Sequence, residues 1–128
     1  MSKPTVTVRE VGPRDGLQMI RSVMPTEVKL RWIAAMAASG LRQMEVASFV
    51  PPAAMPQMAD APQLVAAVRA AHPGLHVVAL APNLRGAQNA AAAGAVPASN
   101  GPAKLTGRLA APTVASRRWG AKAYSRNG

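Results

Sequence analysis

The 128-residue sequence predicts an α/β fold in which three strand–helix units form a parallel sheet. Three short runs rich in strand-forming residues alternate with three longer segments whose apolar residues recur at helical spacing. Gly and Pro residues punctuate the connections between these segments. Strands that alternate with helices of about ten to fourteen residues favour parallel pairing with right-handed crossovers.

The first predicted unit contains a strand, a loop and a helix. Residues 5–11 alternate apolar and polar side chains and stop at a Gly-Pro pair, which predicts a strand followed by a loop over residues 12–24. Thr26 is expected to cap the helix, because its side-chain oxygen can accept a backbone hydrogen bond in the first turn. Apolar residues then recur at helical spacing until Gly40 ends the helix.

The second predicted unit begins with an extended run over residues 43–50. A loop rich in Pro and Met follows, and Asp60 is expected to cap a helix that ends at Ala71. The apolar stripe of this helix consists of Leu64, Val65 and Val68.

The third predicted unit begins with residues 76–81, a run of Val and Leu short enough for a buried strand. Asn83 follows this run and is expected to cap a helix over residues 84–93 rather than to bind a ligand. Gly94 closes that helix. The three units together repeat the order strand, helix three times.

The pattern changes after Ala95. Residues 96–128 are dominated by Ala, Gly, Pro, Ser and Arg and contain no acidic residue, a composition typical of linkers or disordered segments. We therefore divide the chain into residues 1–95, which carry the strand–helix pattern, and a basic tail over residues 96–128, in which no regular structure is expected. The tail also fits a shifted reading frame of a GC-rich gene, and translation of the other two frames would test that hypothesis.

Composition and charge exclude several classes of protein. No stretch is apolar enough to cross a bilayer and the N-terminus lacks a secretory layout, so no membrane partner and a cytoplasmic location are expected. The absence of cysteine excludes disulfides, thiolate zinc sites and a Cys nucleophile. The net charge of +10 raises the question of nucleic acid. However, residues 1–95 contain nine basic and five acidic residues, whereas the tail contains six basic residues and no acidic one.

Polar residues follow two of the predicted strands. The first strand leads into Arg14, Asp15 and Gln18, and the second contains Glu45 and ends at Ser48. The loops after the strands of a parallel barrel open on one face, so these five side chains are expected to converge. Taken alone, the Arg14–Asp15 pair can also be a surface salt bridge in a turn. An unpaired carboxylate in a buried strand is costly, which favours a functional role for Glu45.

The motifs around these residues resemble a known enzyme family. The segments VREVGPRDGLQ, MEVASFVPPAAMPQMAD and ALAPNLRGAQNAAAAG are similar in order and spacing to the start of hydroxymethylglutaryl-CoA lyases, members of the DRE-type metallolyase superfamily. The resemblance covers residues 5–95. It implies that the three units are the first part of a (β/α)8 TIM barrel, a fold that typically needs about 250 residues.

The resemblance also implies roles for the five polar residues. Asp15 matches the aspartate that ligates Mg²⁺ or Mn²⁺, and Arg14 matches the arginine that stabilises negative charge on an enolate oxygen. Glu45 matches an active-site glutamate needed for activity, and Gln18 and Ser48 match positions near the metal and the bound substrate. The implied reaction is a retro-Claisen cleavage of a 3-hydroxy-3-methylglutaryl-CoA-like substrate to acetyl-CoA and a keto acid, a step of leucine degradation.

Other parts of the family pattern have no counterpart in this sequence. These are a His-x-His pair and an asparagine that complete the metal site, and a cysteine-bearing glycine-rich loop. The isolated chain is therefore expected to have little or no lyase activity, because Asp15 alone would hold a divalent cation weakly. The resemblance implies an acyl-CoA as the small-molecule partner and a possible homo-oligomer for full-length members.

Two other functions stay open from the sequence. A synthase of the same superfamily, which condenses an acyl-CoA with a 2-oxo acid, would share the GPRDG motif. A non-enzymatic basic module acting through the tail would bind DNA or RNA in a salt-sensitive way. Nucleic acid is not expected as a partner, because the tail has only two aromatic residues and no groove-reading helix.

Overall fold

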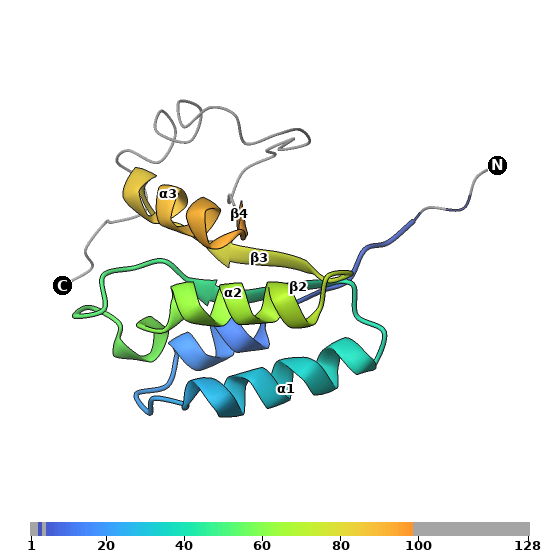
Figure 1. The fold of residues 1–128 in the computed structure, drawn as a ribbon, viewed down its shortest axis with the longest axis horizontal. Helices are drawn as coiled ribbons and strands as arrows, with labels where there is room; N and C mark the ends of the chain where they lie inside the picture. The colour runs from blue at the N-terminus through green and yellow to red at the C-terminus, as the bar shows by residue number, and fades with distance from the viewer. Residues whose placement is uncertain (1–2, 4, 99–128) are drawn as a thin grey trace.

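A parallel sheet organises the fold. The computed structural model describes residue 3 and residues 5–98, and these form a sheet with helices packed along it (Figure 1). The strands lie in sequence order, β1 (Arg9–Glu10), β2 (Gln43–Ser48), β3 (His76–Leu80) and β4 (Val96–Ala98), and each neighbouring pair is parallel. The helices are α1 (Thr26–Ala38), α2 (Ala61–Ala71) and α3 (Leu84–Ala93). The predicted α/β class with a parallel sheet is confirmed.

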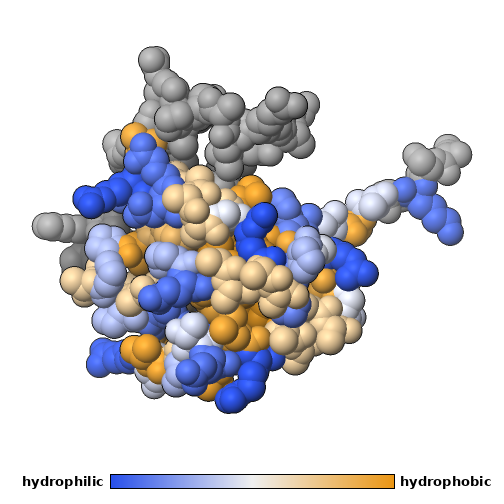
Figure 2. Space-filling view, viewed as in Figure 1, coloured by the Kyte–Doolittle hydropathy of each residue, from blue (hydrophilic) through white to orange (hydrophobic). Residues whose placement is uncertain are grey.

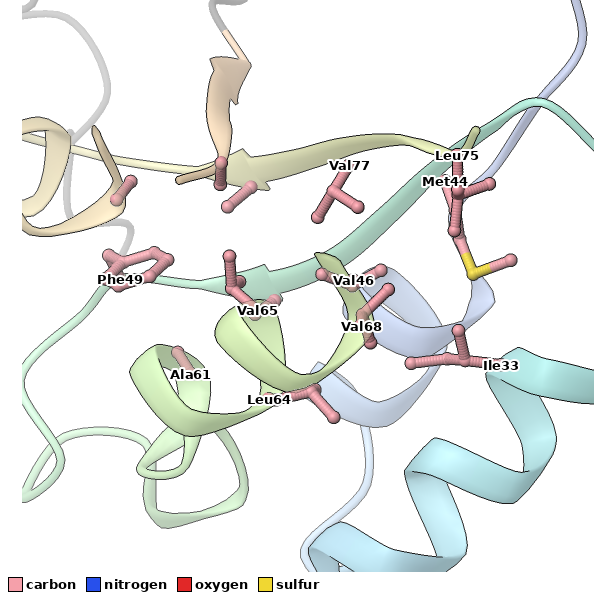
Figure 3. Close-up of a cluster of buried hydrophobic side chains, with 14 residues drawn as sticks. Ile33, Met44, Val46, Phe49, Ala61, Leu64, Val65, Val68, Leu75 and Val77 are labelled. Carbon is pink, nitrogen blue, oxygen red and sulfur yellow. The ribbon is translucent and has the colours of Figure 1, made fainter. Parts of the chain in front are cut away.

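The hydrophobic core lies between the sheet and helix α2, which packs between α1 and α3. Figure 3 shows Val46 of β2 and Val65 and Val68 of α2 in one cluster, with Ile33 of α1 beside it. The predicted apolar stripe of α2 is confirmed, because Leu64 is buried with these two valines. Complete burial of a Val or Leu side chain stabilises the fold by about 1.5–3 kcal/mol. This packing holds β2, the strand that carries two of the predicted site residues, at the centre of the molecule.

The first strand is much shorter than predicted. Only Arg9 and Glu10 pair with β2, whereas the prediction covered residues 5–11. Val6 and Val8, two of the apolar residues that suggested the strand, are exposed. Alternation alone therefore overestimated this strand, because it takes no account of which residues find a pairing partner.

A helical turn replaces part of the predicted loop over residues 12–24. This turn, η1 (Gly12–Gly16), has the wide hydrogen bonding of a π-helix, in which the Leu17 N–H donates to the Gly12 carbonyl. Pro13 fits the start of such a turn, because proline has no N–H that would need a partner there. Wide turns of this kind are frequent at functional sites.

Three predicted helix ends are confirmed. Gly40 follows α1 with φ of 97°, and Gly94 follows α3 with φ of 91°, a left-handed backbone that glycine adopts without a steric penalty. At the start of α3 the Asn83 side chain accepts a hydrogen bond from the backbone N–H of Gly86 at 2.8 Å. Asn83 is therefore a helix cap, as expected.

The two other predicted caps are wrong, because neither Thr26 nor Asp60 makes a capping hydrogen bond. Pro25 occupies the cap position of α1, and Thr26 is the first helical residue. Asp60 does occupy the cap position of α2, but its side chain makes no capping hydrogen bond. It accepts instead from Thr26 Oγ1 and from Lys29 Nζ, each at 2.7 Å. A charge-assisted hydrogen bond to an ammonium is stronger than a bond to a backbone N–H, so the tertiary partner prevails.

A fourth strand begins where no regular structure was expected. β4 pairs with β3 in parallel, with Val96 opposite Val78 and Ala98 opposite Leu80. The sequence did not suggest this strand because it has three residues and contains Pro97, which is tolerated at a sheet edge. Residues 99–128 lie outside the described residues, so the expectations for the basic tail stay predictions.

The surface of the described part shows no membrane-spanning feature. Figure 2 shows hydrophilic and hydrophobic residues interleaved on the face that carries α1 and α2. Within residue 3 and residues 5–98, no helix combines the length and apolar character that a bilayer crossing requires.

Asn83→Ala tests the cap of α3. We expect the free energy of unfolding to fall by about 1 kcal/mol, because the Gly86 N–H loses its acceptor. Urea denaturation followed by circular dichroism measures the change. Asn89→Ala is the matched control, since Asn89 is exposed in the same helix and its replacement should change stability by less than about 0.5 kcal/mol. Equal losses in the two variants would contradict the cap.

Candidate active site

The predicted site residues come from β2, from the helical turn η1 and from Gln18 just beyond that turn, and β2 and η1 pack against each other. Glu45 and Ser48 are both buried in β2. A bulge shifts the register between β2 and β3 directly after Glu45, between Glu45 and Ala47. Bulges re-aim side chains next to active sites. Here the bulge follows the strand residue that carries the buried carboxylate.

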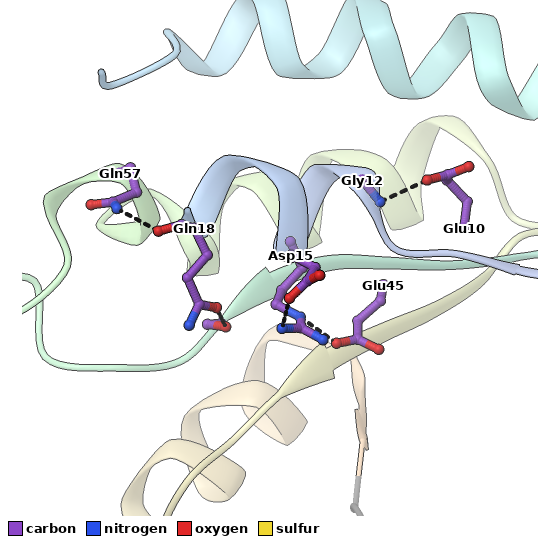
Figure 4. Close-up of polar contacts among 8 residues, drawn as sticks. Glu10, Gly12, Asp15, Gln18, Glu45 and Gln57 are labelled. Carbon is purple, nitrogen blue, oxygen red and sulfur yellow. Dashed lines mark hydrogen bonds and ion pairs between the residues drawn. The ribbon is translucent and has the colours of Figure 1, made fainter. Parts of the chain in front are cut away.

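The Arg14 guanidinium links the two acidic residues of the site. Its Nε donates to Glu45 Oε1 at 2.5 Å, and its Nη1 donates to Asp15 Oδ1 at 2.9 Å. Figure 4 shows Asp15 on η1 and Glu45 on β2 approaching this common point. The side chains of Arg14 and Glu45 are 17% and 6% exposed, so their ion pair is largely shielded from water. A buried carboxylate requires such a partner.

The Arg14–Asp15 contact is therefore half of a three-residue contact rather than an isolated surface salt bridge. A guanidinium has five N–H donors in a fixed plane, and within the described residues these contacts use two of them. The remaining donors can bind a further oxygen atom. Because two carboxylates hold the plane, its orientation is set before any ligand arrives.

The other two predicted residues contact each other beside this group. Ser48 Oγ donates to Gln18 Oε1 at 3.0 Å, which joins the end of β2 to the chain just beyond η1. The structure thus brings all five predicted residues to the junction of η1 and β2, in two contact groups. Arg14, Asp15 and Glu45 form the charged group, and Gln18 and Ser48 form the neutral one.

The position of η1 depends on close packing at Gly12. The Gly12 N–H donates to Glu10 Oε1 at 2.7 Å. A Cβ atom at Gly12 would lie 2.8 Å from the same oxygen and 3.2 Å from the Trp32 ring of α1. A larger residue would therefore crowd the Glu10 and Trp32 side chains, which would have to shift to make room for it.

Asp15 is the predicted site residue best suited to a divalent cation. Its side chain is 55% exposed, and a carboxylate oxygen is the hard ligand that Mg²⁺ and Mn²⁺ prefer. Within the described part of the chain, no group of three His, Cys, Asp or Glu residues is placed to hold a metal ion. The predicted site residues therefore offer a divalent cation one exposed carboxylate ligand, Asp15, which is only part of a metal site.

A buried polar group that the sequence did not predict lies behind the site. Lys29 is 1% exposed, and its Nζ donates to Asp60 Oδ1 and to the Gln57 carbonyl, each at 2.7 Å. A signal was present in the sequence, since Lys29 lies four residues before Ile33 and so shares the apolar face of α1. A lysine on a buried face requires an anionic partner.

Known proteins match about 70% of this chain. No family model matches the chain. The mitochondrial hydroxymethylglutaryl-CoA lyase of Gallus gallus is 49% identical over 90 residues, which cover 70% of this chain and 30% of that relative. The matched part of the chain belongs to the hydroxymethylglutaryl-CoA lyase family. Relatives of this lyase family with mitochondrial and with cytoplasmic names both match the chain.

Solved structures of hydroxymethylglutaryl-CoA lyases share the fold. The lyase from Pseudomonas aeruginosa matches with a TM-score of 0.65 at 42% identity, over 70% of this chain and 30% of that one. The lyase from Acinetobacter baumannii, solved with coenzyme A and 3-methylmalate, matches with a TM-score of 0.64 at 37% identity, over 70% and 29%. The predicted partial TIM-barrel architecture is confirmed. The chain spans less than a third of the length of the relatives it matches, between 19% and 32%.

Arg14→Met tests the central ion pair. We expect the free energy of unfolding to fall by about 2–3 kcal/mol, because Glu45 stays buried without its charged partner. Adding Glu45→Gln should recover part of this loss, because a neutral amide is less costly to bury. Urea denaturation of both variants measures the coupling.

Arg9→Met is the matched control for this cycle. Arg9 is exposed and makes two long contacts of 3.4 Å with Gln43, so its replacement should change stability by less than about 0.5 kcal/mol. If Glu45→Gln leaves the loss from Arg14→Met unchanged, the two side chains do not stabilise each other.

Proposed function

We propose that this site serves carbon–carbon lyase chemistry on a 3-hydroxy-3-methylglutaryl-CoA-like substrate, giving acetyl-CoA and a keto acid. The observation that supports it most is the Arg14 guanidinium, which Glu45 and Asp15 hold in one orientation at the junction of η1 and β2. Membership of the lyase family supports the same reaction. Because the chain spans about 30% of its relatives, the activity is proposed for the site within a whole enzyme.

The proposed reaction is a retro-Claisen cleavage. A base removes the proton of the substrate's tertiary hydroxyl, and the hydroxyl carbon becomes a keto group as the neighbouring carbon–carbon bond breaks. The electron pair of that bond forms an enolate on the thioester side, and protonation of the enolate carbon gives acetyl-CoA. Most of the new charge develops on the thioester oxygen, so a hydrogen-bond donor fixed at that oxygen lowers the barrier.

Arg14 is proposed to stabilise the enolate oxygen. A guanidinium stays charged at any physiological pH and binds oxyanions through donors in a rigid plane. Its two carboxylate contacts fix that plane in advance, which reduces the reorganisation needed as charge develops. Glu45 is proposed as the active-site glutamate, in direct contact with Arg14.

Gln18 and Ser48 are proposed to contact the substrate. Each has one hydrogen-bonding group engaged with the other at 3.0 Å, which leaves the Gln18 amide nitrogen and the Ser48 lone pairs for polar atoms of a ligand. Their mutual contact holds both side chains in one arrangement, which favours binding because less rotamer freedom is lost.

Asp15 is proposed to ligate Mg²⁺ or Mn²⁺. When bound, the cation would supply positive charge that acidifies the substrate's hydroxyl group. Asp15 contributes a single carboxylate. In the 128-residue chain most ligands of the cation would therefore be water molecules, and the cation would bind weakly. We therefore expect little or no turnover by the 128-residue chain alone.

An acyl-CoA is the proposed small-molecule partner. The Acinetobacter baumannii neighbour was solved with coenzyme A, and it covers 70% of this chain. For the whole enzyme we also propose a cytoplasmic location, a role in leucine degradation and self-association. Binding of DNA or RNA through the basic tail concerns residues outside those described.

A chimera tests the proposed function. Residues 5–95 would replace the corresponding segment of the Pseudomonas aeruginosa lyase, and cleavage of 3-hydroxy-3-methylglutaryl-CoA would be measured with Mg²⁺. We expect activity, and we expect Asp15→Ala and Arg14→Met each to lower kcat by about 10²-fold or more, because each removes a charge that the transition state requires. Arg9→Met is the control and should leave kcat unchanged.

The outcomes of this assay separate the candidate functions. A folded chimera that keeps full activity with Asp15→Ala would contradict the role of that residue. Consumption of acetyl-CoA together with a 2-oxo acid, in place of acetyl-CoA release, would identify the synthase reaction of the same superfamily. The unmodified 128-residue chain is assayed in parallel, and turnover by it would overturn the expected lack of activity.

A further inference from the structure

A buried polar cluster connects α1 with the start of α2 directly behind the site. Lys29 Nζ donates to Asp60 Oδ1 at 2.7 Å, and Thr26 Oγ1 donates to Asp60 Oδ2 at 2.7 Å. Both oxygens of the Asp60 carboxylate are therefore bound by side chains of α1. This arrangement fixes the first turn of α2 against the first turn of α1.

Lys29 also fixes the loop that precedes α2. Its Nζ donates to the carbonyl of Gln57, which lies in a short 3-10 helix, η2 (Pro56–Met58). A buried ammonium is costly unless its charge and its donors are compensated, and here a carboxylate and a carbonyl provide both. The backbone of Gln57 is thereby held relative to both helices.

The Gln57 side chain extends from this anchored backbone toward the candidate site. Its Nε2 donates to the carbonyl oxygens of Gln18 and Ile20, each at 3.0 Å. Figure 4 shows Gln57 beside Gln18, at the end of the helical turn that carries Asp15. Carbonyl groups at the end of a helical turn lack partners within it, so an amide from another loop satisfies two of them. Gln18 in turn accepts from Ser48 at the end of β2.

We propose that Gln57 is a positioning residue of the active site. Its amide clamps the backbone from Gln18 to Ile20 and so sets the Gln18 side chain against Ser48, with the buried Lys29–Asp60 pair as the anchor of the clamp. This inference deepens the proposed function, because it rests on Gln18 and Ser48 as the residues that bind the substrate. It assigns a role to a loop that the sequence marked only as rich in Pro and Met.

Gln57→Met in the full 128-residue chain tests the clamp. The substitution removes the amide donors but keeps the side-chain length and the backbone carbonyl that Lys29 binds. Trypsin cleavage after Arg21, which adjoins the clamped backbone, should become about tenfold faster under native conditions, as the loss of two ordinary hydrogen bonds predicts. Cleavage after Arg31, in the middle of α1, should stay at the wild-type rate. The NMR signals of the Gln18 side-chain amide should shift.

Two further variants complete this test. Gln63→Met is the matched control, because Gln63 is exposed on α2, and it should leave both readouts unchanged. Gln57→Asn has an amide that is one methylene too short to reach both carbonyls, and it should behave as Gln57→Met does. Gln57→Asn therefore tests the clamp independently if the Gln57→Met variant does not fold. A folded Gln57 variant with wild-type cleavage after Arg21 overturns the clamp.

Ligand binding separates a positioning role from a merely structural one. We expect both Gln57 substitutions, placed in the chimera described above, to raise the KM for 3-hydroxy-3-methylglutaryl-CoA about fivefold or more in the assay with Mg²⁺. Faster trypsin cleavage of the 128-residue variants with an unchanged KM of the chimera would overturn the positioning role. If the chimera without a Gln57 substitution does not cleave this acyl-CoA, the proposed function fails, whereas the trypsin and NMR readouts of the 128-residue chain still decide on the clamp.

Discussion

A carboxylate buried within a parallel strand is tolerated only where a cation meets it, and the first segment of this chain is arranged around that requirement. Arg14 reaches Glu45 because the chain forms a helical turn immediately after the two-residue β1. This turn packs closely on α1 at Gly12, where a Cβ atom would lie 3.2 Å from the Trp32 ring. The ion pair therefore connects the packing of η1 on α1 with the electrostatics of β2.

Periodicity and glycine stops predicted most of the regular elements. The apolar residues of α2 form a stripe that packs against the sheet, and their helical spacing is visible in the sequence. The glycines after α1 and α3 adopt a left-handed backbone, which is a common sequence signal of a helix end. The convergence of the five polar residues was also predictable, because parallel strands present their ends on one edge. Their roles in catalysis stay proposals, since placement alone does not assign a function.

The remaining differences share one physical cause, which is that sequence rules consider neighbours along the chain. A capping rule assigned Asp60 to backbone N–H groups, but Lys29 and Thr26, about thirty positions earlier, are stronger or better placed partners. Alternation extended β1 beyond the residues that β2 can pair with, and it overlooked β4, which is only three residues long. Each of these features is decided by a partner that folding brings close.

The polar contacts described above have a consequence for biosynthesis. Apart from the contact between adjacent residues Arg14 and Asp15, the hydrogen bonds of the charged group, the Gln18–Ser48 pair and the Gln57 clamp join residues 28 to 39 positions apart. Every partner in them lies between Arg14 and Asp60, so all are present once the ribosome has released the first two strand–helix connections. The contacts among these residues can thus form early during translation, before the later strands of such a barrel have been made.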